Sequence, residues 1–233
     1  MSILHHWANP WFVSLLFLFT TGCPDGGQTT TANSPTLIHP TTGQPFRILI
    51  LGDSLTEGYG VSPSQCYPTL LEEMLNEEHS VGGTRYEVIN GGVTGSTTSG
   101  GASRIDWHLQ NPPDFLIVAL GGNDGLRGIP PEESKKNLRS IVLQAQKREV
   151  PVIIAGMKMP PNYGSQYLQR FENMFPQLAE ELNIPLLPFL LEGVGGEPQM
   201  NLPDRIHPNP AGHQRICQTV YQHLIKHLPQ TQP

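Results

Sequence analysis

Short, almost continuous apolar runs alternate with longer amphipathic segments along most of this chain. Such runs are typical of strands that are buried on both faces, as in parallel sheets, and the longer segments repeat apolar residues at helical spacing. The pattern predicts strands at residues 46–51, 86–89, 115–120 and 150–155 and a weaker one at 185–189, with helices at 67–78, 103–109, 131–148, 166–182 and 209–227. This alternation predicts an α/β fold with a parallel sheet covered by helices on both faces.

The N-terminal segment lacks charge. The first 24 residues contain no Asp, Glu, Lys or Arg, and residues 11–19 form an apolar run. That run suits a signal peptide and is too short to span a bilayer, which takes about 20 residues. We therefore expect a signal peptide at residues 1–23. The sequence Thr-Thr-Gly before Cys23 is similar to a bacterial lipobox, which implies a lipid anchor at Cys23. Secretion without lipid and a buried N-terminal helix are the alternatives, the helix being the weaker.

A polar segment separates this N-terminus from the predicted sheet. Residues 24–45 contain four Pro, three Gly and six Thr with no apolar periodicity, so they cannot bury enough surface to offset the entropy of ordering. We expect a flexible Thr/Pro/Gly-rich tether here and a single folded domain at residues 46–233.

The composition of the chain argues against some classes of function. The formal net charge is −6 and only 15% of the 233 residues are charged, which argues against a nucleic-acid partner. Gly (24) and Pro (23) together make up about a fifth of the chain, well above the usual share, so many tight turns are expected. Cys66 and Cys217 form no metal-binding spacing; they either pair with each other or remain separate thiols.

Four polar, glycine-rich blocks follow predicted strands or precede the last helix. In open parallel sheets the site lies at the carboxyl ends of the strands, which is where these blocks fall. They are GDSLTEGYG at residues 52–60, NGGVTGSTTSGG at 90–101, GGNDGLRG at 121–128 and DRIHPNPAGH at 204–213.

Single blocks also allow simpler interpretations, or could belong to other known motifs. Ser54 and Glu57 fit a capping box, which would make Ser54 a helix N-cap. The dinucleotide-binding, P-loop and G-x-S-x-G patterns are all absent. No histidine shows a paired metal spacing, so we expect neither a cofactor nor a metal ion.

In their order along the chain, the four blocks resemble those of the SGNH (GDSL) hydrolase family, within which they look closest to the bacterial extracytoplasmic thioesterase, lysophospholipase and arylesterase group. The resemblance implies a three-layer α/β/α fold with a central, mostly parallel five-stranded sheet, the flavodoxin-like SGNH hydrolase fold. It also implies a catalytic triad of Ser54, His207 and Asp204. The implied oxyanion hole consists of the backbone N–H groups of Ser54 and Gly95 and the side-chain amide of Asn123.

The second block matches less closely, because Gly91 and Gly92 stand where larger residues are usual. Gly92 is thus a rival to Gly95 for the oxyanion role. Asp53 and Asp124 are interpreted as structural residues that bind loop backbone. His213 follows the implied triad segment and could support it from behind.

The resemblance implies a serine hydrolase that cleaves carboxylic esters or thioesters through an acyl-enzyme, with arylesterase, thioesterase or lysophospholipase-like activity. A carbohydrate acetylesterase and a non-catalytic ligand-binding lipoprotein are the alternatives. The acyl pocket is expected in the loops at residues 125–131 and 158–163, from Leu126, Ile129, Met159 and Tyr163. We further expect a small-molecule acyl substrate, a monomer, and an extracytoplasmic place in a bacterium, either periplasmic or membrane-anchored.

Overall fold

The computed structural model describes residues 43–80 and 83–228 of the chain. The expected signal peptide and residues 24–42 of the expected tether lie outside this part and remain predictions. None of the helices in the described part is long and apolar enough to cross a membrane.

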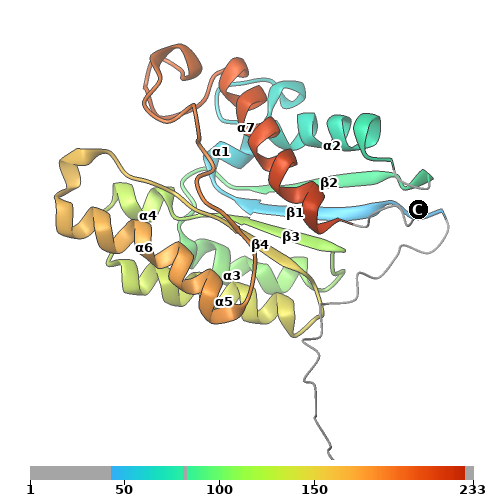
Figure 1. Ribbon diagram of the computed structural model, residues 1–233, viewed down its shortest axis with the longest axis horizontal. Helices are drawn as coiled ribbons and strands as arrows, with labels where there is room; N and C mark the ends of the chain where they lie inside the picture. Colours follow the sequence, from blue (N-terminus) through green and yellow to red (C-terminus); the bar gives the residue numbers. More distant parts are fainter. Residues whose placement is uncertain (1–42, 81–82, 229–233) are drawn as a thin grey trace, which may run out of the picture. The chain divides into compact units, whose positions relative to one another are not determined.

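A five-stranded parallel sheet forms the middle layer (Figure 1). Its spatial order is β2-β1-β3-β4-β5, and each neighbouring pair is parallel. The strands are β1 (Phe46–Gly52), β2 (Tyr86–Gly92), β3 (Phe115–Ala119), β4 (Val152–Ala155) and β5 (Leu186–Leu187). In this register Gly52 pairs with Gly92 on one side and with Ala119 on the other, so the loops that follow these three strands begin at the same edge.

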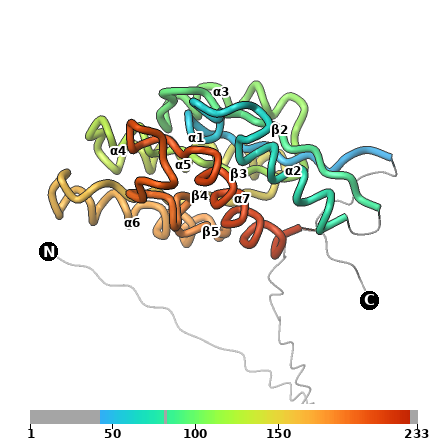
Figure 2. Tube along the Cα trace, turned by 90° about the horizontal axis from the view of Figure 1, so that it is seen from above, coloured from blue at the N-terminus to red at the C-terminus, as the bar shows by residue number. Residues whose placement is uncertain are grey.

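Helices cover both faces of the sheet, which confirms the predicted three-layer α/β/α architecture. α2 (Tyr67–Glu78) and α7 (Pro210–Leu224) pack together on one face, and α3 (Thr98–His108), α5 (Pro131–Gln146) and α6 (Ser165–Leu182) pack on the other (Figure 1). The 90° view shows α2 and α7 lying side by side (Figure 2). Two short helices, α1 (Ser54–Glu57) and α4 (Gly122–Leu126), stand directly after β1 and β3.

The remaining turns are short 3₁₀ helices that connect these elements. They span Pro63–Gln65, Pro161–Tyr163, Pro198–Met200 and Ile225–His227. The last one ends the predicted helix at residues 209–227, where Asn209 is the N-cap and accepts a hydrogen bond from the Gly212 N–H at 3.1 Å.

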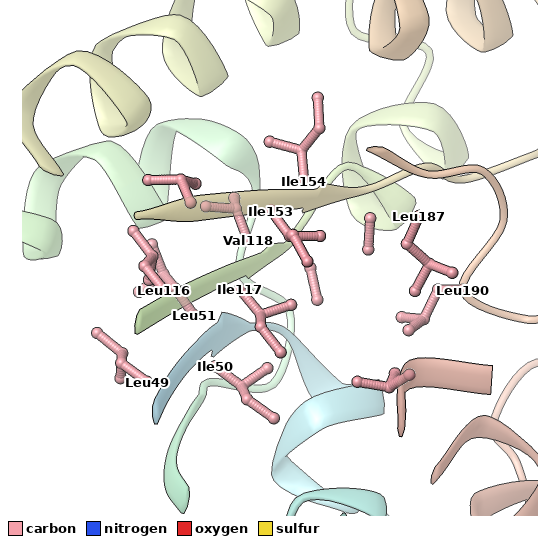
Figure 3. Packing of buried hydrophobic residues seen from close by; sticks show 14 of the residues in the cluster. Leu49, Ile50, Leu51, Leu116, Ile117, Val118, Ile153, Ile154, Leu187 and Leu190 are labelled. Carbon is pink, nitrogen blue, oxygen red and sulfur yellow. The ribbon is translucent and has the colours of Figure 1, made fainter. Parts of the chain in front are cut away.

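The core lies on both faces of the sheet. β1, β3 and β4 are almost wholly buried, as their apolar runs predicted, and Figure 3 shows side chains from these strands together with Leu187 and Leu190. Burying these side chains removes a large apolar area from water and fixes the strand ends that carry the polar blocks.

Two predicted boundaries were wrong. α3 begins at Thr98 rather than residue 103, because Gly100 and Gly101 are part of the helix although glycine is a poor helix former. A Cβ on Gly101 would lie 2.3 Å from Leu120 Cδ1, so the glycine allows α3 to pack closely on the core. The predicted fifth strand, at 185–189, is reduced to the two residues of β5.

Candidate active site

Ser54 stands at the tight junction between β1 and α1. The N-cap of α1 is Asp53, whose Oδ1 accepts the Leu55 N–H at 3.0 Å. The capping-box interpretation of Ser54 was therefore wrong, since Ser54 is the first residue inside the helix. Glu57 also has another partner, because its Oε2 accepts the Thr94 N–H at 2.6 Å. The Ser54 hydroxyl is thus not needed as a cap and is available for another side chain.

That side chain is His207, from the segment before α7. Its Nε2 lies 3.0 Å from Ser54 Oγ, and its Nδ1 lies 2.7 Å from Asp204 Oδ2. The other carboxylate oxygen of Asp204 accepts the backbone N–H groups of Ile206 at 2.9 Å and His207 at 3.0 Å. The structure thus brings together three predicted site residues that lie up to 153 positions apart in the sequence.

Hydrogen bonds to Asp204 keep it ionised. The backbone N–H and then the side chain of His207, followed by the Ile206 N–H, lower the pKa of Asp204 to about 2. A carboxylate in this position orients the imidazole and stabilises a proton on it. The Tyr59 ring lies against the His207 ring with centroids 4.4 Å apart, and so limits how far the imidazole can tilt.

Asn123 and Gly95 come to the same edge from β3 and β2. Asn123 lines the cavity that contains Ser54 and His207, and its Nδ2 donates to the Ser96 carbonyl at 3.1 Å and to Asp53 Oδ2 at 3.3 Å. Gly95 has a φ of +75°, a conformation that favours glycine, and its carbonyl accepts Arg127 Nη2 at 2.9 Å.

The two candidate oxyanion glycines differ in their surroundings. A Cβ on Gly92 would lie 2.1 Å from the Glu57 backbone nitrogen, so Gly92 permits contact between β2 and α1. A Cβ on Gly95 would meet only Arg127 Nη2, at 3.6 Å. The space beside Gly92 is therefore filled by the backbone of α1, whereas the space beside Gly95 is largely open.

Asp53 and Asp124 each accept a backbone N–H group, but from the first turn of a helix, α1 or α3, rather than from a loop as predicted. Asp124 is fully buried and accepts hydrogen bonds from the Thr98 N–H at 2.8 Å and the Ser134 hydroxyl at 3.0 Å, which ties α3, α4 and α5 together. Asp53 is 2% exposed, and this burial raises its pKa to about 6.

Arg104 was not singled out from the sequence, although it braces the site. Its guanidinium donates to the Ser96 hydroxyl and the Gly52 carbonyl, both at 2.6 Å, and to the Gly91 carbonyl at 3.1 Å. The side chain thus joins the ends of β1 and β2 to the loop that contains Gly95. A basic residue in the second turn of α3, three positions after the second block, was the available signal.

His213 does not contact the triad residues through a hydrogen bond. It is fully buried between α7 and α2, and its Nδ1 accepts the Tyr67 N–H at 3.2 Å. Burial lowers the pKa of His213 to about 4, so the imidazole is neutral. Its support for the site is limited to holding the two helices together.

The two described cysteines are separate buried thiols, which decides between the two alternatives for Cys66 and Cys217. In the described part of the chain, no group of three His, Cys, Asp or Glu side chains is arranged to hold a metal ion.

A cavity of about 530 Å³ opens at Ser54 and His207. Of the four apolar residues expected to form it, Leu126 and Met159 line the cavity, while Ile129 and Tyr163 do not. The hydroxyl of Tyr163 instead donates to the Leu126 carbonyl at 3.2 Å, which turns its ring away from this role. Other apolar wall residues that the sequence did not reveal include Met157, Phe189, Leu191 and Ile206.

Comparisons with known proteins show which family this chain belongs to. The model of the GDSL-like Lipase/Acylhydrolase family matches residues 50–215. An arylesterase from Vibrio mimicus is 38% identical over 183 residues, which cover 78% of this chain and 90% of that protein. "Thioesterase 1/protease 1/lysophospholipase L1" from Escherichia coli K12 is 38% identical over 163 residues, covering 70% of this chain and 75% of the relative. The crystal structure of TesA superimposes with a TM-score of 0.74 at 35% identity, covering 78% of this chain and 99% of that one.

The parallel α/β/α sheet and these matches define an enzyme of the esterase class with the SGNH hydrolase fold. The chain belongs to the GDSL-like Lipase/Acylhydrolase family, as its four sequence blocks predicted.

Proposed function

We propose that this protein hydrolyses carboxylic esters or thioesters through a Ser54–His207–Asp204 triad and an acyl-enzyme. The observation that carries the proposal is the continuous chain of hydrogen bonds from Ser54 Oγ through His207 to Asp204, with Ser54 and His207 lining the cavity. A serine hydroxyl is a weak nucleophile until a base within hydrogen-bond distance takes its proton, and this chain supplies that base.

The reaction runs in two halves. Ser54 Oγ attacks the acyl carbonyl while His207 Nε2 takes its proton, and Asp204 stabilises the resulting imidazolium. The tetrahedral intermediate then collapses, the bond to the leaving oxygen or sulfur breaks, and His207 gives that atom the proton. In the second half, His207 takes a proton from water, which attacks the acyl-Ser54 ester. Collapse releases the carboxylic acid and restores the serine.

The negative oxygen of each tetrahedral intermediate needs hydrogen-bond donors. We assign them as the backbone N–H groups of Ser54 and Gly95 and the side-chain amide of Asn123. The open space beside Gly95 and the packed position of Gly92 support this choice. The present hydrogen bonds of Asn123, at 3.1 and 3.3 Å, are long, so one amide hydrogen can turn toward substrate at small cost.

The cavity wall supports an acyl substrate. Its apolar side chains suit a hydrocarbon chain, and the names of the relatives include arylesterase, thioesterase and lysophospholipase. Acetylated carbohydrate is the second candidate substrate. A panel of p-nitrophenyl esters of increasing acyl length, run beside acetylated xylan, separates the two candidates.

The direct test is hydrolysis of p-nitrophenyl butanoate by the wild type and by Ser54→Ala. We expect the substitution to lower kcat by at least about 10⁴-fold, because the nucleophile is lost. Ser140→Ala, on the exposed side of α5, is the matched control and should keep full activity. Equal rates for wild type and Ser54→Ala would refute the proposal and favour the alternative of a ligand-binding lipoprotein.

We further propose that the protein is extracytoplasmic, with a signal peptide at residues 1–23, a tether at 24–45 and a lipid on Cys23. The support is the uncharged N-terminal sequence and the similarity to a lipobox. Lipidated protein partitions into the detergent phase of a Triton X-114 separation, and Cys23→Ala should abolish this. Partitioning unchanged by Cys23→Ala would refute lipidation.

A further inference from the structure

Two cationic side chains line the same cavity as Ser54. Arg205 and Lys158 are both exposed at its mouth, and in the described part of the chain neither side chain has an ion-pair or hydrogen-bond partner. Lys158 Nζ lies 5.0 Å from the centre of the Phe189 ring, another wall residue. The acidic group that lines the cavity, Asp53, is 2% exposed and already bonded to Leu55 and Asn123. Two exposed cations therefore line the cavity in a chain whose net charge is −6, and the ionised Asp204 that precedes Arg205 is already bonded to His207.

Arg205 has an unusual backbone. Its φ of +59° is in the left-handed region, which is unfavourable for a residue with a Cβ. Its N–H donates to the Leu202 carbonyl at 2.9 Å, so the surrounding turn holds this conformation. Glu149 and Asn183 also have a positive φ, but of these three residues only Arg205 lines the cavity, and strained residues cluster at functional sites. Glycine would fit the turn without strain, and an arginine stands there instead.

The position of Arg205 relates it to one half of the substrate. It lies two residues before His207, and both line the cavity. In the proposed mechanism His207 gives its proton to the leaving alcohol or thiol, so the leaving group must lie against this segment. The acyl chain has the apolar wall of Met157, Met159 and Leu191. A charge on Arg205 would therefore act on the leaving group.

We propose that Arg205 selects esters or thioesters whose leaving group carries an anionic substituent such as a phosphate. This inference rests on the proposed function, because the leaving-group side is defined by the role of His207. Guanidinium and ammonium groups are the usual partners of phosphate, and a cavity lined by one sign of charge concentrates oppositely charged substrate. Two sources share this chemistry: a thioester of a phosphorylated thiol and an acyl ester of glycerol phosphate.

The experiment compares substrates that share an acyl chain and a reacting bond and differ in charge. The thioester pair is butanoyl-coenzyme A and S-butanoyl-N-acetylcysteamine. The oxygen-ester pair is 1-octanoylglycerol 3-phosphate and 1-octanoylglycerol. We expect the wild type to prefer the anionic member of at least one pair by about tenfold in kcat/KM, mainly through KM, and the pair that shows it identifies the source. Raising the salt from about 20 mM to about 300 mM should shrink the preference, because screening weakens charge attraction.

Two variants of Arg205 separate the effect of its charge from the effect of its strained backbone. Arg205→Gly removes both the charge and the strain, so it should lower the anionic-to-neutral ratio about tenfold without lowering Tm. Arg205→Lys keeps the charge in the same strained turn and should keep most of the preference. Lys136→Ala, which removes an exposed cation on α5 away from the cavity, is the charge-matched control and should leave the ratio unchanged.

Failure of this inference is distinguishable from failure of the proposed function. Ser54-dependent hydrolysis with equal kcat/KM for both members of each pair would overturn the inference alone. Loss of the preference in Arg205→Lys as complete as in Arg205→Gly would overturn it as well, because charge would not be the cause. Hydrolysis that is unaffected by Ser54→Ala would overturn both.

Discussion

Two aspartates flank the Ser54–His207 hydrogen bond, and their surroundings shift their pKa values in opposite directions. Asp53, at the floor of the site, is buried, and burial raises its pKa to about 6. Asp204, at the rim, has a side chain that is 38% exposed and accepts three hydrogen bonds, and its pKa falls to about 2. Burial is thus the main influence on the pKa of Asp53, whereas hydrogen-bond donors are the main influence on the pKa of Asp204.

This difference explains why the exposed aspartate suits the role of triad acid. A carboxylate that stabilises an imidazolium must stay ionised throughout the working pH range, and Asp204 does so at any pH well above 2. Asp53 titrates near pH 6 and is committed to the N-cap of α1 and to Asn123. Adjacency to Ser54 in the sequence is therefore no guide to which acid does the chemistry.

The largest expected effect comes from Asp204→Asn. An amide in place of the carboxylate favours the wrong tautomer of His207 and removes the charge that stabilises the imidazolium. We expect kcat/KM for p-nitrophenyl butanoate to fall by about 10³–10⁴-fold, with little change in Tm because the side chain is exposed. Asp106→Asn, on the exposed surface of α3, is the control. An Asp204→Asn variant that keeps more than a tenth of wild-type activity would contradict the assignment.

Asp53→Asn should change the pH dependence of stability. The folded-state pKa of Asp53 lies above the ordinary value of 3.8, so its contribution to stability is present below about pH 3.8 and is lost as the pH rises through 6. Asparagine does not titrate and still caps α1. The free energy of unfolding of the variant relative to wild type should therefore rise by about 2 kcal/mol between pH 4 and pH 7, measured by urea denaturation. A pH-independent difference would show that Asp53 is not perturbed.

The same variant sharpens the comparison of activities. Asp53→Asn places an amide opposite the Asn123 amide, so we expect kcat/KM at pH 7.5 to fall by about tenfold, far less than in Asp204→Asn. Equal losses of kcat/KM in Asp53→Asn and Asp204→Asn would contradict the different roles given to the two aspartates.

His213→Asn should change the pH dependence of stability in the opposite direction. The folded-state pKa of His213 is depressed to about 4, so its contribution to stability is present above pH 6.5 and is lost as the pH falls through 4. Asparagine offers an oxygen to the Tyr67 N–H and does not titrate. The variant should be less stable than wild type at pH 7.5 yet lose on the order of 3 kcal/mol less on acidification to pH 4. A steeper acid loss in the variant would contradict this.

Much of the fold was predictable because the buried strands are nearly continuous apolar runs. All five strands begin within two residues of their predicted starts, and α2 has its predicted bounds. Misjudged elements depend on tertiary contacts: the start of α3 looked like a loop until the packing of Gly101 on Leu120 was known. Local propensity cannot express such a contact between residues far apart in the chain.

The candidate site was predictable to a similar degree. The resemblance of the four blocks to the SGNH family singled out Ser54, Asn123, Asp204 and His207, and the strand order explains why the loops after the strands meet at one edge. Only part of the cavity wall was predicted, because Phe189 and Leu191 follow a two-residue strand that gives little sequence signal. The positive φ of Arg205 has no sequence signature at all, because it depends on the turn that holds the residue.

The most direct test of the central claim, that His207 and Asp204 activate Ser54, is covalent labelling by a fluorophosphonate followed by mass spectrometry. The claim predicts one phosphonyl group per chain on the peptide that contains Ser54. It also predicts labelling at least about 10³-fold slower in His207→Ala, because the serine loses its base. An unlabelled Ser54, or equal labelling rates with and without His207, would contradict it.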